Sequence, residues 1–149
     1  MENVKIYDMT LEDFENIKDI LISEFDDFWT PQILKNEIIG ENKKYIVAKN
    51  DDAIVGFAGL FLSVDNVEIM NIVTKKTERG KGVGRMMLIK LIEFAKNNNY
   101  ETILLEVNEN NIPARKLYES TGFEQIGFRK EYYNSTDNAI IMSKKVNIL

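Results

Sequence analysis

The amino-acid sequence predicts an α+β fold, in which about four helices interrupt a mostly antiparallel set of about seven strands. Two observations support this prediction. Apolar residues recur at helical spacing in some segments and form short strand-like runs in the others. Their order along the chain is a strand, two helices, three strands, a helix, a strand, a helix and two strands. At 149 residues, the whole chain (1–149) fits a single domain with one core.

The first third of the chain contains a strand and two helix starts. Val4 to Tyr7 reads as a short strand. Thr10 is typical of a helix N-cap, with Asp13 three residues later. The apolar stripe of this helix is expected at Leu11, Phe14, Ile17 and Leu21. A second start follows at Thr30-Pro31, an N-cap followed by proline at the first helical position, and this helix carries Ile33, Leu34 and Ile38.

Three strands and a long helix are expected in the middle of the chain. The strand-like runs are Tyr45–Lys49, Ile54–Leu62 and Val67–Val73, with turn-like residues between them. After a glycine-rich segment comes a helix with an apolar face at Met87, Leu88, Leu91, Ile92 and Ala95.

The last third of the chain continues this pattern. Thr102–Val107 is a strongly apolar strand, and Pro113–Ser120 reads as a short helix. Two strands, near Phe123–Tyr132 and Ala139–Lys144, flank a polar turn at Asn134–Asn138.

The composition excludes several kinds of site. The chain has no cysteine and no histidine, so disulfides, thiolate metal sites and a cysteine nucleophile are excluded, and no metal site is expected. A general base must be a carboxylate, a tyrosine, a lysine or ordered water. The net charge of −5 argues against nucleic-acid binding. Without an apolar run of roughly 20 residues or a signal peptide, we expect a cytoplasmic protein that does not enter membranes.

The segment Arg79-Gly80-Lys81-Gly82-Val83-Gly84-Arg85 lies between a predicted strand and the long helix. Glycines let the backbone approach a ligand closely, and a helix N-terminus supplies N–H donors and a positive dipole. The basic side chains add cationic donors. A phosphate or pyrophosphate is therefore the natural ligand, although a glycine-rich turn with solvated basic residues is the alternative.

Two common nucleotide-binding patterns do not fit this segment. No G-x-x-x-x-G-K-[ST] string exists in the chain. A G-x-G-x-x-G pattern fails too, because its third glycine would fall on Arg85 or Met87.

The glycine segment instead resembles the [QR]-x-x-G-x-[GA] pyrophosphate loop of the GCN5-related N-acetyltransferases. Arg79, Gly82 and Gly84 are the matching residues, and the strand Glu68–Val73 stands where that family places the strand before the loop. The resemblance implies acetyl-CoA as cosubstrate and CoA as product. It also implies that the sheet is splayed between the strands near 67–73 and 102–107. The pantetheine arm would contact Ile72, Val73 and Thr74, and the pyrophosphate would contact Arg79, Gly80, Lys81, Gly82, Val83, Gly84 and Arg85.

A second segment, Asn111 to Phe123, resembles the family's N-x-x-A-x-x-L-Y-x-x-x-G-F signature at every fixed position. From the residues alone, Asn111 is a good N-cap for the short helix that contains Pro113. The resemblance adds a contact between Asn111 and acetyl-CoA, and the two roles are compatible.

Two further residues are candidates for proton transfer. Glu106 interrupts an apolar strand, so its carboxylate either lies at the edge of a cleft or simply points to solvent through strand alternation. Tyr118 could be an ordinary half-buried tyrosine.

The chain is most similar to the RimI group of the family, which acetylates the N-terminal amine of a ribosomal protein. The supporting segments are Leu104–Val107, Phe28–Thr30, Arg129–Tyr133 and Ala139–Met142. In that group, the residue matching Glu106 accepts the proton and the residue matching Tyr118 donates one. The chain departs from the group at Asn138, where an acid is usual.

The resemblance therefore implies direct transfer of an acetyl group to a protein N-terminus, an alanine of a ribosomal protein, in a ternary complex. A small amine, such as a polyamine, an amino acid or an aminoglycoside, is the alternative acceptor, and a non-catalytic CoA-binding module is the third reading. Phe28 and Trp29 would be substrate-side aromatics, core residues or oligomer contacts. A monomer or a weak homodimer is expected.

Overall fold

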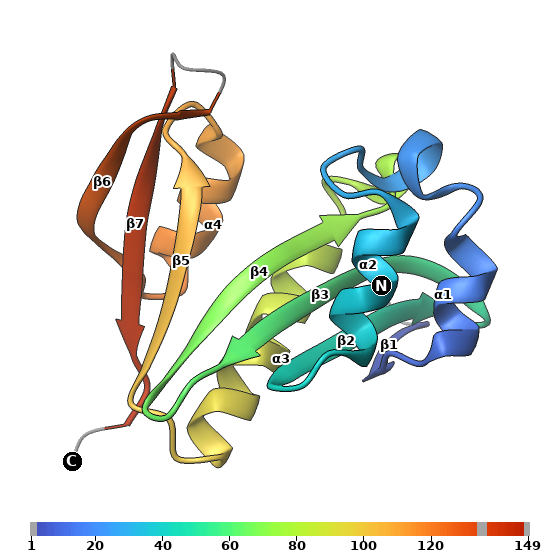
Figure 1. Ribbon diagram of the computed structural model, residues 1–149, viewed down its shortest axis with the longest axis horizontal. Coiled ribbons are helices and arrows are strands. Elements are labelled where there is room, and N and C mark those ends of the chain that lie inside the picture. Colours follow the sequence, from blue (N-terminus) through green and yellow to red (C-terminus); the bar gives the residue numbers. More distant parts are fainter. Residues whose placement is uncertain (1–2, 134–136, 148–149) are drawn as a thin grey trace. The chain divides into compact units, whose positions relative to one another are not determined.

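The structure, a computed structural model, describes residues 3–133 and 137–147. Its sheet has seven strands in the order β1-β2-β3-β4-β5-β7-β6 (Figure 1). The strands are β1 (Val4–Asp8), β2 (Lys43–Asn50), β3 (Ala53–Leu62), β4 (Asn66–Thr74), β5 (Thr102–Asn108), β6 (Glu124–Tyr133) and β7 (Asp137–Lys145). Residues 134–136 of the predicted polar turn lie outside the described residues. The α+β prediction is confirmed.

Four α-helices and two short helical turns occur in the described part of the chain. The α-helices are α1 (Leu11–Ile17), α2 (Pro31–Ile39), α3 (Val83–Asn97) and α4 (Ile112–Ser120). A π-helix, η1 (Leu21–Phe25), follows α1, and a 3₁₀ turn, η2 (Lys76–Glu78), precedes the glycine segment. None of these helices combines the length and the apolar character that crossing a membrane requires.

Four described strand pairings are antiparallel, and the pairing of β4 with β5 is parallel. Antiparallel ladders join β1 to β2, β2 to β3, β5 to β7 and β7 to β6. The parallel pairing of β4 with β5 is described for three residue pairs, which join Asn66–Glu68 to Thr102–Leu104. The described pairing thus covers the first three residues of β4 and of β5, which all belong to one compact unit.

The chain divides into two compact units. The first comprises Met1–Leu62 and Met70–Leu91, and the second comprises Ser63–Ile69 and Ile92–Leu149. The prediction of one domain stays a prediction.

In the first unit, helices pack on both faces of the sheet. Phe57 on β3 belongs to a buried cluster with residues of α1 and α2 such as Phe14 and Leu34. Its neighbour Gly56 faces α3 instead, because a Cβ added there would lie 2.8 Å from the Cε of Met87. The alternation of strand side chains thus places β3 between the two helical layers.

The start of α1 is fixed by a capping box. Thr10 Oγ1 accepts a hydrogen bond from the Asp13 N–H at 3.2 Å, and Asp13 Oδ2 accepts one from the Thr10 N–H at 2.9 Å. Asp13 is buried and its Oδ1 also pairs with Lys49 at 2.9 Å. Burial alone would raise the pKa of Asp13, but the contacts with Lys49 and Thr10 outweigh it and hold the pKa below its ordinary value.

The prediction for this first helix is wrong in two details. The α-helix ends at Ile17, so Leu21 lies in η1 rather than in the same helix. Leu21 is nevertheless buried, because the π-helix keeps it directed at the core, whereas Leu11 in the first turn is 45% exposed. The local apolar spacing predicted burial correctly at Phe14, Ile17 and Leu21, but it could not show the change of helix type.

Candidate active site

The glycine segment adopts the backbone conformation that a ligand-binding loop needs. Gly80 and Gly82 have φ angles of 77° and 91°, in the left-handed region that other residues rarely adopt. A Cβ added at either position would meet no atom within 4 Å, so the backbone is open to solvent on that side. The helix α3 begins at Val83, so the unpaired N–H groups of its first turn and its positive dipole lie next to these glycines.

This loop fits the pyrophosphate of acetyl-CoA. Residues 79–82 are exposed while Val83 is buried, and the donors that the segment offers are N–H groups with cationic neighbours. Lys81 lies in this exposed segment and contacts Glu78 at 3.3 Å. Lys81 would exchange that exposed pairing for one with phosphate at little energetic cost.

The structure brings Arg79 together with the end of β4. Its Nε donates to the carbonyl of Thr74 at 3.4 Å, and its Nη2 donates to the carbonyl of Phe25 at 2.9 Å. The guanidinium therefore joins the loop to β4 and to η1. The predicted contact of Arg79 with phosphate remains a prediction, and these bonds give Arg79 a structural role that the sequence did not reveal.

The predicted pantetheine strand is the second half of β4. Val73 is buried in the core of the first unit, while Ile72 and Thr74 are partly exposed. Beside them, Asn71 has a buried Oδ1 without a hydrogen-bond partner. A buried acceptor left unpaired is costly, so this oxygen marks a position where a bound molecule could donate a hydrogen bond. Sequence reasoning missed Asn71; an amide in an apolar strand was the available signal.

In the second unit, Glu106 lies on the less buried face of β5. The strand alternates buried and partly exposed residues, with Ile103, Leu105 and Val107 buried. The Glu106 side chain is 23% exposed, and its Oε1 pairs with Nη2 of Arg129 at 2.8 Å. The alternation therefore does turn Glu106 away from the core, but its carboxylate is held in an ion pair rather than freely solvated.

The helix α4 carries the other two predicted residues of this unit. Asn111 caps it, because its Oδ1 accepts a hydrogen bond from the Ala114 N–H at 3.3 Å. Tyr118 is 9% exposed and packs edge-on against Phe123, with ring centroids 5.8 Å apart. Capping by Asn111 is thus confirmed, while its contact with acetyl-CoA stays a prediction.

The aromatic residues before α2 differ in burial. Phe28 is 66% exposed, and Trp29 packs against the core of the first unit. Their rings lie 5.9 Å apart. Trp29 is therefore partly a core residue, and Phe28 remains available for contacts outside the chain.

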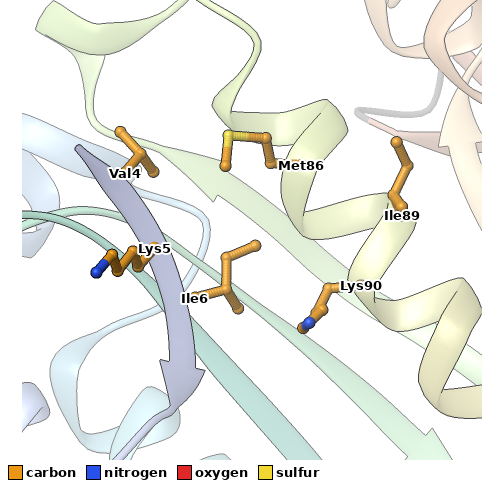
Figure 2. A pocket seen from close by; sticks show the side chains of 6 residues that line it. All are labelled: Val4, Lys5, Ile6, Met86, Ile89 and Lys90. Carbon is orange, nitrogen blue, oxygen red and sulfur yellow. The ribbon is translucent and has the colours of Figure 1, made fainter. Parts of the chain in front are cut away.

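A groove of about 360 Å³ lies between β1 and α3, and none of the predicted site residues lines it. Figure 2 shows the residues that line it, which are Val4, Lys5 and Ile6 on the strand and Met86, Ile89 and Lys90 on the helix. Its lining is apolar except for the two lysines, and it contains none of the residues predicted for acetyl transfer.

A family model matches the part of the chain that contains the glycine segment, Glu106 and Tyr118. The model of the acetyltransferase (GNAT) family matches residues 4–123. The chain belongs to this family. It is an N-acetyltransferase that uses acetyl-CoA as the acyl donor, and the glycine segment is included in the match.

Individual relatives of this acetyltransferase agree with the family match. A Bacillus subtilis protein, whose name is that of a candidate ribosomal protein bS18-alanine N-acetyltransferase, is 31% identical over 145 residues, 95% of each chain. The Haemophilus influenzae ribosomal protein bS18-alanine N-acetyltransferase is 35% identical over 121 residues, 77% of this chain and 80% of the relative. The crystal structure of the Escherichia coli ribosomal-protein-S18-alanine N-acetyltransferase superposes with a TM-score of 0.89, at 25% identity, covering 98% and 96% of the two chains.

Proposed function

We propose that this acetyltransferase modifies the N-terminal α-amine of a ribosomal protein that begins with alanine. The observation that carries the proposal is the similarity to relatives named for this reaction, over 95% of this chain in one case and 77% in another. A protein with this substrate works where ribosomes are assembled, which supports the expected cytoplasmic location. The expected oligomeric state, a monomer or a weak homodimer, stays a prediction.

The proposed reaction is a direct transfer in a ternary complex. The neutral amine attacks the thioester carbonyl of acetyl-CoA, so that a C–N bond forms and the C–S bond breaks. Glu106 accepts the proton that the amine loses, and Tyr118 gives a proton to the departing thiolate. Solvent then returns a proton to Tyr118 and takes one from Glu106, which leaves the enzyme unchanged. The absence of cysteine and histidine favours this route over an acyl-enzyme.

The environments of the two residues support these roles. Glu106 is partly exposed, so its carboxylate is reachable by an acceptor or by a bridging water. Tyr118 is mostly buried, and the contact of its ring with Phe123 restricts the orientation of the side chain.

An α-amine is well suited to a single carboxylate base. Its pKa is about 7.7–8.0, so on the order of a tenth of it is neutral at pH 7, whereas lysine, with a pKa of about 10.4, is almost wholly protonated. Glu106 therefore needs to remove only the proton released during the attack.

A small acceptor panel tests the proposal by following CoA release from acetyl-CoA. It contains a peptide with the alanine N-terminus of the ribosomal protein, the same peptide with that terminus blocked and a lysine free, and spermidine. We expect the free N-terminus to be used in strong preference to the blocked peptide and to spermidine. The Glu106→Gln variant should lower kcat/KM by about 100-fold if Glu106 is the base. Turnover confined to spermidine would discard the protein substrate, and full activity of Glu106→Gln would discard the base.

A further inference from the structure

The ion pair between Glu106 and Arg129 joins a predicted catalytic group to a residue that the sequence motifs did not assign. The two side chains meet at 2.8 Å, and they are 23% and 55% exposed, respectively. A guanidinium beside a carboxylate restricts its orientation and offsets its charge. Arg129 thus affects the orientation and the net charge of the Glu106 carboxylate that an incoming acceptor meets.

The strand register explains why these two residues meet. Glu106 on β5 is opposite Ile141 on β7, and Ile141 is opposite Gly127 on β6. Arg129 is two residues beyond Gly127, so its side chain is on the same face of the sheet as Glu106 and reaches it diagonally across β7. The regular pairing of residues 127–129 lies between two register shifts in β6, so a change of register there would remove this contact.

Two other carboxylates at this end of the second unit are held by amide groups. Asp137 accepts hydrogen bonds from the side-chain amides of Asn108 and Asn110, at 3.1 and 3.0 Å. Glu109 accepts one from the backbone N–H of Asn138 at 2.8 Å. The pairing of Glu106 is therefore of a different kind, because a full positive charge and not an amide dipole faces it.

We propose that Arg129 is a specificity-determining residue. It favours acceptors whose amine loses its proton easily and disfavours acceptors whose amine stays protonated. This inference rests on the proposed function, in which Glu106 is the base. Because Arg129 already offsets the charge of Glu106, a lysine or polyamine ammonium gains little by approaching it. A neutral α-amine needs only an oxygen lone pair of the carboxylate, which the ion pair positions.

The test compares wild type with Arg129→Gln, Arg129→Lys and the matched control Lys130→Gln. The control removes the same charge from the next residue of β6, whose side chain is exposed. Each protein is assayed with the alanine peptide, the blocked peptide with a free lysine, and spermidine. Titration with acetyl-CoA, whose predicted loop lies in the first unit, verifies that each variant is folded.

In Arg129→Gln, we expect the ratio of kcat/KM for the alanine peptide to kcat/KM for the cationic acceptors to fall by about two- to fivefold, the range for a partly exposed ion pair. The change should include a lower KM for spermidine. Arg129→Lys should restore much of the ratio, and Lys130→Gln should leave it unchanged. A merely structural role would lower activity toward all acceptors equally.

The inference would be overturned if Arg129→Gln left the kcat/KM ratio unchanged, or if Arg129→Lys did not restore it. Either result would leave the proposed function intact. Failure of wild type to use the alanine peptide would overturn the proposed function itself. Equal use of the peptide and spermidine by wild type would overturn the selectivity assigned to Arg129.

Discussion

Replacement of Gly82 by alanine tests whether the glycine loop is built for backbone conformation. Gly82 has a φ of 91°, and an added Cβ would meet no atom within 4 Å. The substitution therefore introduces backbone strain without a clash. For a residue with a Cβ, the left-handed conformation costs roughly 1–2 kcal/mol.

This strain must appear in one of two measurable quantities. If the free loop keeps its conformation, the free energy of unfolding falls by about 1–2 kcal/mol. If the free loop relaxes and returns to this conformation on binding, the dissociation constant of acetyl-CoA rises by about 5- to 30-fold instead. The two losses together should equal the strain, so unfolding and binding must both be measured, by denaturant titration and by calorimetric titration with acetyl-CoA.

Gly82→Asn provides the matched comparison at the same position. Asparagine is larger than alanine but adopts the left-handed conformation more readily. The total loss should therefore be smaller for asparagine than for alanine. A larger loss for asparagine would show that side-chain volume, and not backbone conformation, decides binding at this loop, and the reasoning would be refuted.

Three further predictions concern other parts of the molecule. Tyr118→Phe should lower kcat by about tenfold, less than the loss at the base, because the leaving thiolate has a pKa of about 8.5 and needs little help; steady-state assays with the alanine peptide check this. Gly59→Ala should lower the melting temperature by several degrees, because a Cβ there would overlap the buried ring of Tyr45 and overpacking costs about 1–3 kcal/mol. Calorimetry measures the melting temperature, and an unchanged value would contradict the packing argument. Asp13→Asn should lower the free energy of unfolding by about 1–2 kcal/mol at pH 7. Because the pKa of Asp13 is lowered in the folded protein, its carboxylate contributes to the free energy of unfolding above the ordinary value of 3.8, and this contribution is lost as the pH falls through the folded value. Denaturation measured at a series of acidic pH values should therefore show the difference between Asp13→Asn and wild type vanish below that pH.

The sequence predicted most elements because their signals are local. Thr10 and Asp13 are three residues apart, and this spacing alone allows the capping box that the structure contains. Thr30-Pro31 marked the start of α2 for the same reason. Helical spacing likewise identified the buried face of α3, where Met87 and Leu91 are fully buried.

The glycine loop was also predictable in its kind. Gly80 and Gly82 are the two glycines of the segment with positive φ angles, and the residue type itself permits that conformation. The strand before the loop and the helix after it were visible as changes in apolar period.

Other features depended on residues far apart in the chain. The phosphate contact of Arg79 stays a prediction, and its hydrogen bond to the carbonyl of Phe25, which is 54 residues away, could not be predicted from the sequence. The sequence allowed Glu106 to be either solvated or at a cleft, and only the register of three strands decided that it meets Arg129.

Local spacing therefore determined where helices, strands and the glycine turn form, since each depends on residues within a few positions of one another. The partners of polar side chains that lie far apart in the chain were decided by tertiary structure alone. The unpaired oxygen of Asn71 illustrates the difference, because its burial depends on elements packed around β4 and not on its sequence neighbours. The reason is physical: a hydrogen bond or an ion pair requires two groups within about 3 Å, and only the folded chain brings distant residues that close.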